Sequence, residues 1–295
     1  MKVYLKFLWK LISAPFRFLF WIIKSLFLWM RGAVQNTYKF ISLEPEESEL
    51  PETIQKVTLN PASIFPHINA LRKMVFRCLL VLMITTGFSF VFAQQIMEWL
   101  ARPIGREITL LTIIDVTEPI SVFMRVSLLS GFALALPYII TELAVFIGEG
   151  LRRNTRLFLV FFVVPASTLL FVGGMAFAYF VMLPVAVPFL LNILKFQTTI
   201  RASSYIQFVT GVMFWIGVTF EFPMVIFVIA RLGWISAGTL AKHWRLAIIL
   251  IAVIAALVTP TVDPVNMAIV MGPLIVLYFF SIGLAFIAQR GKKNT

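Results

Sequence analysis

The sequence is poor in cysteine, histidine and acidic residues. It has one cysteine, two histidines and 13 acidic residues among 295. The single cysteine, Cys78, excludes an intrachain disulfide and a cysteine-rich metal site. His67 and His243 border different apolar segments, and neither a Gly-Xaa-Ser-Xaa-Gly motif nor a pair of catalytic carboxylates is present. These absences argue against an intramembrane enzyme.

Charged residues are also scarce, at 13% of the chain, whereas 60% of the residues are hydrophobic. Several apolar runs reach about 20 residues, the length that crosses a bilayer. The sequence therefore predicts an all-α, polytopic membrane protein. The net charge of +12 does not indicate nucleic acid, because the basic residues lie mainly beside the apolar runs, as membrane topology requires.

Residues 1–43 form a basic, amphipathic and aromatic segment. On a helical wheel its only charges fall within about 100° of one another; they are Lys2, Lys6, Lys10, Arg17, Lys24, Arg31 and Lys39. This pattern is typical of a helix that lies in a membrane interface and binds anionic lipid. Cations recur through the apolar part and no small-residue cleavage site follows, which argues against a signal peptide.

We divide the rest of the chain by composition. Residues 44–66 are an acidic, proline-containing linker. Residues 67–288 hold the apolar spans, and residues 289–295 form a basic tail.

Six membrane spans are predicted in the body. Their approximate bounds are Met74–Phe92, Ile120–Phe146, Phe158–Leu183, Ile206–Arg231, Leu246–Val258 and Val265–Ala288. The fifth has only about 13 apolar residues, which is short for a core of about 30 Å, so it implies local thinning or a shielded position. The two longer loops on the outside, about 93–119 and 184–205, are expected to cap the bundle.

The distribution of lysine and arginine orients these spans. Beyond residue 60, twelve basic residues fall on one side: Arg72, Lys73, Arg77, Arg152, Arg153, Arg156, Arg231, Lys242, Arg245, Arg290, Lys292 and Lys293. The opposite loops hold four: Arg102, Arg106, Lys195 and Arg201. The positive-inside rule then places both termini in the cytoplasm.

The fourth span contains the most informative residue, Glu221, near its middle. An ionised acid at that depth costs at least about 2.5–3.5 kcal/mol, so such residues are functional candidates. Pro223 follows, lacks a backbone donor and can leave a carbonyl unpaired one turn earlier. The structural alternative is a neutral Glu221 that closes a hydrogen bond to that carbonyl. We expect the acid to be neutral at rest and to offer a polar contact.

Several motifs, taken together and in order, resemble the TatC family, the multispanning subunit of the twin-arginine protein translocase. They are Leu170–Phe180 with Pro184, Tyr205–Phe208 leading to Phe220–Pro223, the outside turn Thr259–Pro264, and the opening His67, Leu71 and Arg72. The resemblance covers about His67 to the last residue and leaves the first 60 outside. It implies a glove-shaped bundle of six helices in the bacterial or archaeal cytoplasmic membrane, without enzyme activity, metal or cofactor.

The resemblance also implies a function. The protein would bind twin-arginine signal peptides of folded cargo, recruit single-span TatA- and TatB-type subunits and use the proton-motive force, within a homo-oligomeric receptor complex. The implied signal-binding residues are Leu71, Arg72, Phe146, Glu149 and Arg156. The implied residues for partner helices and translocation are Tyr205, Phe208, Glu221 and Pro223, with Pro260 and Asp263 in the outside turn.

Three positions depart from the family's pattern. Ala70 and Thr155 stand where the family has glutamates, and Phe279 follows Tyr278 where the family has an acid. The only carboxylate left in the first cytoplasmic loop is Glu149, and a guanidinium pair binds best to a carboxylate. We therefore expect a divergent member in which Glu149 takes over recognition of the signal arginines.

A proton-coupled transporter of small solutes is the alternative. Two features suit a transporter. Glu221 beside Pro223 could carry a proton, and the third span, which contains Pro165 and Gly173-Gly174, is interpreted as broken. The absence of an obvious internal repeat and the scarcity of acids within the spans, Glu142 and Glu221 alone, argue against it. Asp115 and Glu118 are interpreted as exposed residues of an outside loop.

Overall fold

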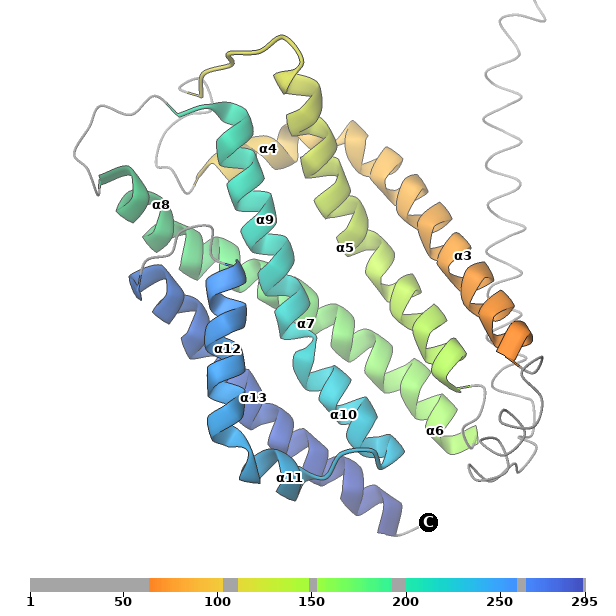
Figure 1. Ribbon diagram of the computed structural model, residues 1–295. Helices are drawn as coiled ribbons and strands as arrows, with labels where there is room; N and C mark the ends of the chain where they lie inside the picture. The colour runs from red at the N-terminus through yellow and green to blue at the C-terminus, as the bar shows by residue number, and fades with distance from the viewer. Residues whose placement is uncertain (1–63, 103–110, 149–152, 193–199, 259–263, 294–295) are drawn as a thin grey trace, which may run out of the picture. The chain divides into compact units, whose positions relative to one another are not determined.

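The computed structural model (Figure 1) describes residues 64–102, 111–148, 153–192, 200–258 and 264–293. The predicted interfacial arm, almost all of the acidic linker, Glu149 and the outside turn with Pro260 and Asp263 lie outside these ranges. Within them, regular structure is helical apart from one isolated bridge between Thr112 and Arg201.

The described chain forms thirteen consecutive helical elements: α3 (Ile64–Val91), α4 (Ala93–Ala101), α5 (Glu118–Gly148), α6 (Arg153–Phe158), η4 (Leu159–Val163), α7 (Val164–Phe177), η5 (Ala178–Met182), α8 (Leu183–Asn192), α9 (Ala202–Phe220), α10 (Phe222–Leu232), α11 (Ala237–Lys242), α12 (Trp244–Val258) and α13 (Pro264–Lys293). They divide into two compact units, residues 1–65 with 144–160 and residues 66–143 with 161–295. The second and larger unit contains Glu221 and most of the apolar helices.

The predicted all-α membrane architecture is confirmed within the described residues. Five helical stretches are long and apolar enough to cross a membrane: His67–Val91, Glu118–Gly148, Arg156–Leu191, Ala202–Leu232 and Met267–Gln289. A shorter apolar helix, Trp244–Leu257, matches the short fifth span. The first helix begins ten residues before the predicted Met74, because the polar residues around Arg72 continue the helix beyond its apolar part.

The prediction that the third span is broken is wrong. Residues 153–192 form one continuous helix with two π-helical turns, η4 and η5. Pro165 lies just after η4, in the first turn of α7, where a missing backbone donor is tolerated. Gly173 and Gly174 lie inside α7 without interrupting it.

The glycines instead allow α7 and α9 to pack closely. A Cβ on Gly174 would meet the Phe220 side chain at 2.8 Å and the Gly217 backbone at 3.0 Å. A Cβ on Gly217 would meet the ring of Phe171 at 2.8 Å. Small residues at a crossing are the usual means by which membrane helices approach. The crossing lies one turn before Glu221, so it fixes the surroundings of that residue.

We predict that Gly174→Ala destabilises the protein and that Gly173→Ala does not. The new methyl group at position 174 overlaps two neighbours, which costs about 1–3 kcal/mol as overpacking. A Cβ on Gly173 would have nothing within 4 Å, so alanine there gains helix propensity without a clash. Thermal unfolding in detergent measures both, and equal melting temperatures for the two variants would contradict the close crossing.

The segment after the first span is docked on the bundle as expected for a cap. The two carbonyls at the end of α4 accept hydrogen bonds from buried tyrosines: Tyr179 Oη donates to Trp99 O at 2.7 Å, and Tyr205 Oη donates to Leu100 O at 2.8 Å. The rings of Trp99 and Tyr179 stack with centroids 3.7 Å apart. Trp99 O also accepts the backbone N–H of Arg102, so Tyr179 adds a second bond there, whereas Tyr205 supplies the bond to Leu100 O; together the two tyrosines fix α4 against η5 and α9.

Candidate functional site

The helix that carries Glu221 is interrupted at Glu221 itself. Here α9 ends at Phe220 and α10 begins at Phe222, and the two follow one another with a change of direction (Figure 1). Pro223 lies in the first turn of α10 and is buried. The Glu221 N–H donates to Val218 O at 3.1 Å, and its own carbonyl accepts from Met224 and Val225. In the first turn of a helix the backbone N–H groups have no acceptor within the helix, so the N–H that Pro223 lacks would not be used there. The sequence thus favours a new helix that starts just before Pro223.

Glu221 lies well inside the apolar stretch. The span Ala202–Leu232 has 31 residues, so its centre is Gly217 and Glu221 is about 6 Å from it along the helix axis. The side chain is half-buried. The depth inferred from the sequence therefore agrees with the helix bounds, and the acid is displaced toward the end of the span that carries Arg231.

The Glu221 carboxyl has a polar neighbour and one open oxygen. The Ser167 side chain of α7 lies near the carboxyl, whereas Oε1 is buried and has no hydrogen-bond partner within the described residues. No bond from the carboxyl to a backbone carbonyl occurs in the same ranges, which disfavours the structural alternative. A buried oxygen without a partner is unfavourable, so a further hydrogen bond to the carboxyl would be stabilising.

Tyr205 and Phe208 do not join Glu221. Tyr205 is 16 residues before Glu221 on the same helix, which corresponds to about 24 Å. Its hydroxyl is buried and holds α4, while Phe208 is half-buried and packs against the main core. The structure thus gives these two residues structural contacts at the other end of α9.

The predicted signal-binding residues fall in both units. Leu71 and Arg72 are exposed on α3, in the larger unit. Phe146 lies in the last turn of α5 and Arg156 in α6, both in the smaller unit. Glu149 is outside the described residues.

Glu142, the second acid in a predicted span, is already engaged. Its Oε2 lies 2.8 Å from Nη2 of Arg77 on α3, and the Tyr138 hydroxyl, one turn earlier on α5, donates to its Oε1. The side chain is only 9% exposed. Sequence reasoning did not identify Arg77 as its partner. A carboxylate held by an arginine and a tyrosine is poorly available to a further cation.

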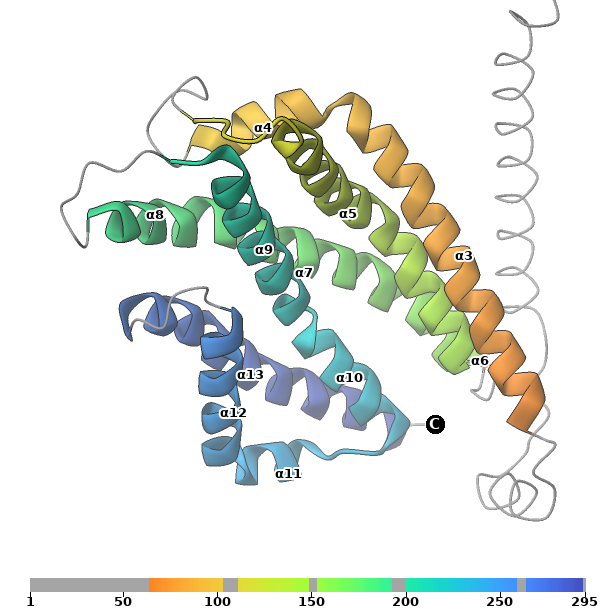
Figure 2. The same cartoon turned by 45° about the horizontal axis from the view of Figure 1, so that its top comes forward.

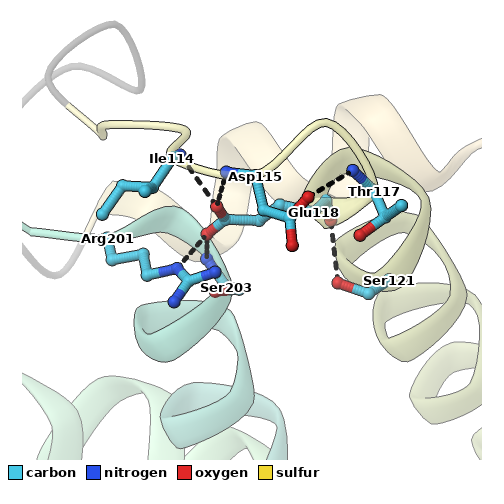
Figure 3. Close-up of polar contacts among 7 residues, drawn as sticks. All are labelled: Ile114, Asp115, Thr117, Glu118, Ser121, Arg201 and Ser203. Atoms are coloured by element: carbon cyan, nitrogen blue, oxygen red, sulfur yellow. Dashed lines mark hydrogen bonds and ion pairs between the residues drawn. The ribbon is translucent and has the colours of Figure 1, made fainter.

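Glu118 is the residue that sequence reasoning misjudged most. The expectation of an exposed loop acid holds for Asp115 but is wrong for Glu118, which is 3% exposed. Its Oε2 accepts from the backbone N–H groups of Ile114 (3.0 Å) and Asp115 (3.3 Å) (Figure 3). Asp115 Oδ1 in turn accepts from Thr117 N at 3.2 Å. The bond from Asp115 N to Glu118 is half of a capping box, while the Asp115 side chain accepts from Thr117 N instead of Glu118 N; the spacing Asp115-Xaa-Xaa-Glu118 was the signal for it.

The other carboxylate oxygen of Glu118 caps a second helix. Oε1 accepts from Ser203 N at 2.8 Å and from Nε of Arg201 at 3.1 Å, at the first turn of α9 (Figure 3). Arg201, the residue before α9, makes no side-chain cap of its own. The bridge between Thr112 and Arg201 lies beside it, with Ala202 N donating to Thr112 O at 3.1 Å. The Glu118 carboxylate therefore joins the starts of α5 and α9. The N-terminus of each helix, which is the positive end of its dipole, faces this negative charge.

Comparison with known proteins identifies the group to which the chain is related. The family model described as Sec-independent protein translocase protein (TatC) matches residues 66–273, more than half of the chain. The chain belongs to the TatC family. This confirms the resemblance seen in the motifs, and the match begins close to the expected His67.

Individual relatives and solved structures agree. The chain is 30% identical over 248 residues to the Sec-independent protein translocase protein TatC of Koribacter versatilis, covering 82% of this chain and 91% of that protein. It is 34% identical to the TatC of Aquifex aeolicus, with 77% and 96% covered. A crystal structure of the twin arginine translocase receptor TatC superposes with a TM-score of 0.64 at 30% identity, covering 76% of this chain and 99% of that chain.

Proposed function

We propose that this chain is the multispanning receptor subunit of a twin-arginine translocase. It binds the twin-arginine signal peptide of folded cargo, recruits single-span TatA- and TatB-type subunits within an oligomeric receptor complex, and operates on the proton-motive force in the cytoplasmic membrane. Membership in a family of Sec-independent protein translocase proteins supports this function, together with several apolar helices long enough to span a membrane.

The observation that carries the proposal is the Glu221 carboxyl with its open, buried oxygen at the α9–α10 interruption. A polar group on a partner's single span can donate to it within the membrane. Such contacts are weak, averaging about 0.6 kcal/mol, which suits an assembly that forms and dissociates. We therefore assign Glu221 to docking of a partner helix, with Pro223 fixing the interruption of the span at this residue.

The transporter alternative requires a path along which Glu221 exchanges protons. Within the described residues, the other span acids are Glu142, which is paired with Arg77, and Glu118, whose oxygens accept four hydrogen bonds. Neither is arranged as a relay partner for Glu221. The comparisons do not favour this alternative.

An export assay tests the proposed function. Cells that produce the chain with TatA- and TatB-type subunits from the same source would carry a folded fluorescent reporter with a twin-arginine signal. We expect export that disappears with an uncoupler and with a twin-lysine signal. Solute uptake by vesicles that contain the chain alone, without reporter export in the cells, would support the transporter instead.

Glu149 is proposed to bind the signal arginines, and we predict different effects for the two nearby acids. Glu149→Gln removes the only loop carboxylate and should reduce crosslinking to a twin-arginine signal peptide about tenfold, because charge-assisted contacts to arginine are strong. Glu142→Gln should change it less than about threefold, since that carboxylate is held by Arg77. Unchanged crosslinking in both variants would show that the loop acid does not bind the signal.

A further inference from the structure

The junction of α11 and α12 forms a corner at one end of the fifth span. The short helix α11 is capped by Ser236, whose Oγ accepts from Thr239 N at 3.0 Å, and it ends at Lys242, with His243 next. The chain turns sharply between α11 and α12 (Figure 2). Helix α12 then starts at Trp244 and has 15 residues, about 22 Å, which is less than a bilayer core of about 30 Å. The bilayer must therefore thin around α12, or this helix must be shielded by its neighbours.

A cavity of about 400 Å³ opens at this corner. Its lining is Ala241, Trp244, Phe279 and Ile282, contributed by α11, α12 and α13. Almost all of this lining is apolar, and Trp244 and Phe279 are exposed. The volume is within the range of about 300–1,000 Å³ that ligand pockets occupy.

Basic side chains alternate with the residues that line the cavity. Lys242, His243 and Arg245 are all exposed, and the Arg245 guanidinium lies 5.6 Å from the centre of the Trp244 ring. Arg245 thus lies beside an indole that forms the cavity wall, in a cation–π arrangement. The positive charge and the apolar cavity belong to the same few residues.

The sequence around this corner provides no acid to balance these charges. From residue 232 to residue 295 the only acidic residue is Asp263, which follows the far end of α12 in the sequence. Lys242 and Arg245 form no ion pair within the ranges that the structure describes. Within those ranges the two cations lack a negative partner, which an anion from another molecule can supply. By the positive-inside rule the corner faces the cytoplasmic leaflet, which is rich in anionic lipid.

We propose that this corner binds one anionic phospholipid. The phosphate contacts Lys242 and Arg245, and one acyl chain occupies the cavity between Trp244 and Phe279. The combination of an amphipathic aromatic wall, an apolar cavity and unbalanced cations fits a headgroup and a tail together. A helix of only 15 residues gains from an ordered lipid at its end, because the bilayer must thin there. The site is independent of signal recognition and of Glu221.

The proposal is tested by measuring how two fluorescent lipids bind to the full-length chain in neutral detergent. The lipids are phosphatidylglycerol and phosphatidylcholine with identical acyl chains. The wild type should prefer phosphatidylglycerol. The double variant Lys242→Gln with Arg245→Gln should lose about 10- to 30-fold of that affinity, as two surface cations contribute, and leave phosphatidylcholine binding unchanged. Arg245→Lys should keep most of the affinity. Ala241→Phe, which fills the cavity, should weaken both lipids.

The control variant is Arg102→Gln with Arg125→Gln, which removes the same charge from exposed positions on the other side of the membrane topology. An equal loss in this control would show a nonspecific charge effect and overturn the proposal. Equal affinity of the wild type for the two lipids would also overturn it. The proposal would also be overturned if a photoreactive group at position 241 captured a single-span protein but no lipid in membranes. The occupant of the cavity would then be a partner helix. Unchanged melting temperatures would show that the variants are folded.

Discussion

Replacing Glu221 by alanine is expected to abolish most partner contact and export, whereas glutamine is expected to preserve much of both. Alanine removes the carboxyl, including Oε1, which has no hydrogen-bond partner within the described residues. Intramembrane hydrogen bonds contribute about 0.6 kcal/mol on average and up to about 1.7, so the partner's affinity should fall about 3- to 20-fold. Glutamine keeps an acceptor and a donor without ionising. Crosslinking to a TatB-type partner and export of a folded reporter measure the two effects.

The same two variants separate docking from proton transport. A proton carrier must ionise, so Glu221→Gln would be as inactive as Glu221→Ala if the residue shuttled protons. Inactive Gln and Ala variants that both retain full partner contact would exclude the docking role. Glu98→Ala serves as the control, since Glu98 is an exposed acid on α4 and should leave both measurements unchanged.

Glu118→Gln is expected to destabilise the protein more than any exposed acid-to-amide change. The carboxylate accepts four hydrogen bonds, from Ile114, Asp115, Arg201 and Ser203. An amide offers a single acceptor oxygen, and its NH₂ group would face N–H donors, so at least one buried donor loses its partner. We therefore expect glutamine to fail at position 118 although it is tolerated at position 221.

Thermal unfolding and proteolysis of the segment around residues 111–117 measure this effect. Glu118→Gln should lower the melting temperature and expose the segment to protease. Glu98→Gln is the matched control because Glu98 accepts one exposed bond, at 3.4 Å from Gln94. Unchanged stability of Glu118→Gln would mean that the junction of α5 and α9 does not depend on the carboxylate.

Local chemistry was readable from the sequence. Apolar runs predicted the membrane helices. The sequence also marked Pro223 as lacking a backbone donor, whereas the interruption at Glu221 that accompanies it comes from the structure. The half of the Glu118 arrangement that involves Asp115 was also present as a capping-box spacing. Helical geometry alone already separates Tyr205 from Glu221 by about 24 Å.

Contacts between distant segments were not readable in this way. Glu118 bonds to Ser203, 85 residues later, and Glu142 pairs with Arg77 on a different helix. Nothing in the immediate neighbourhood of either acid specifies these partners. Gly174 likewise suggested a helix break, whereas its role is to admit Phe220 at a crossing that only the packed structure reveals.

Arginine-dependent crosslinking of a signal peptide tests the central claim most directly. Photoreactive residues at positions 147 and 151, on either side of Glu149, would be probed with a twin-arginine peptide and with its twin-lysine counterpart in membranes that contain the full-length chain. The proposed receptor function predicts crosslinks to the twin-arginine peptide that free twin-arginine peptide displaces and that twin-lysine does not reproduce. Equal crosslinking of the two peptides, or none from either position, would contradict it.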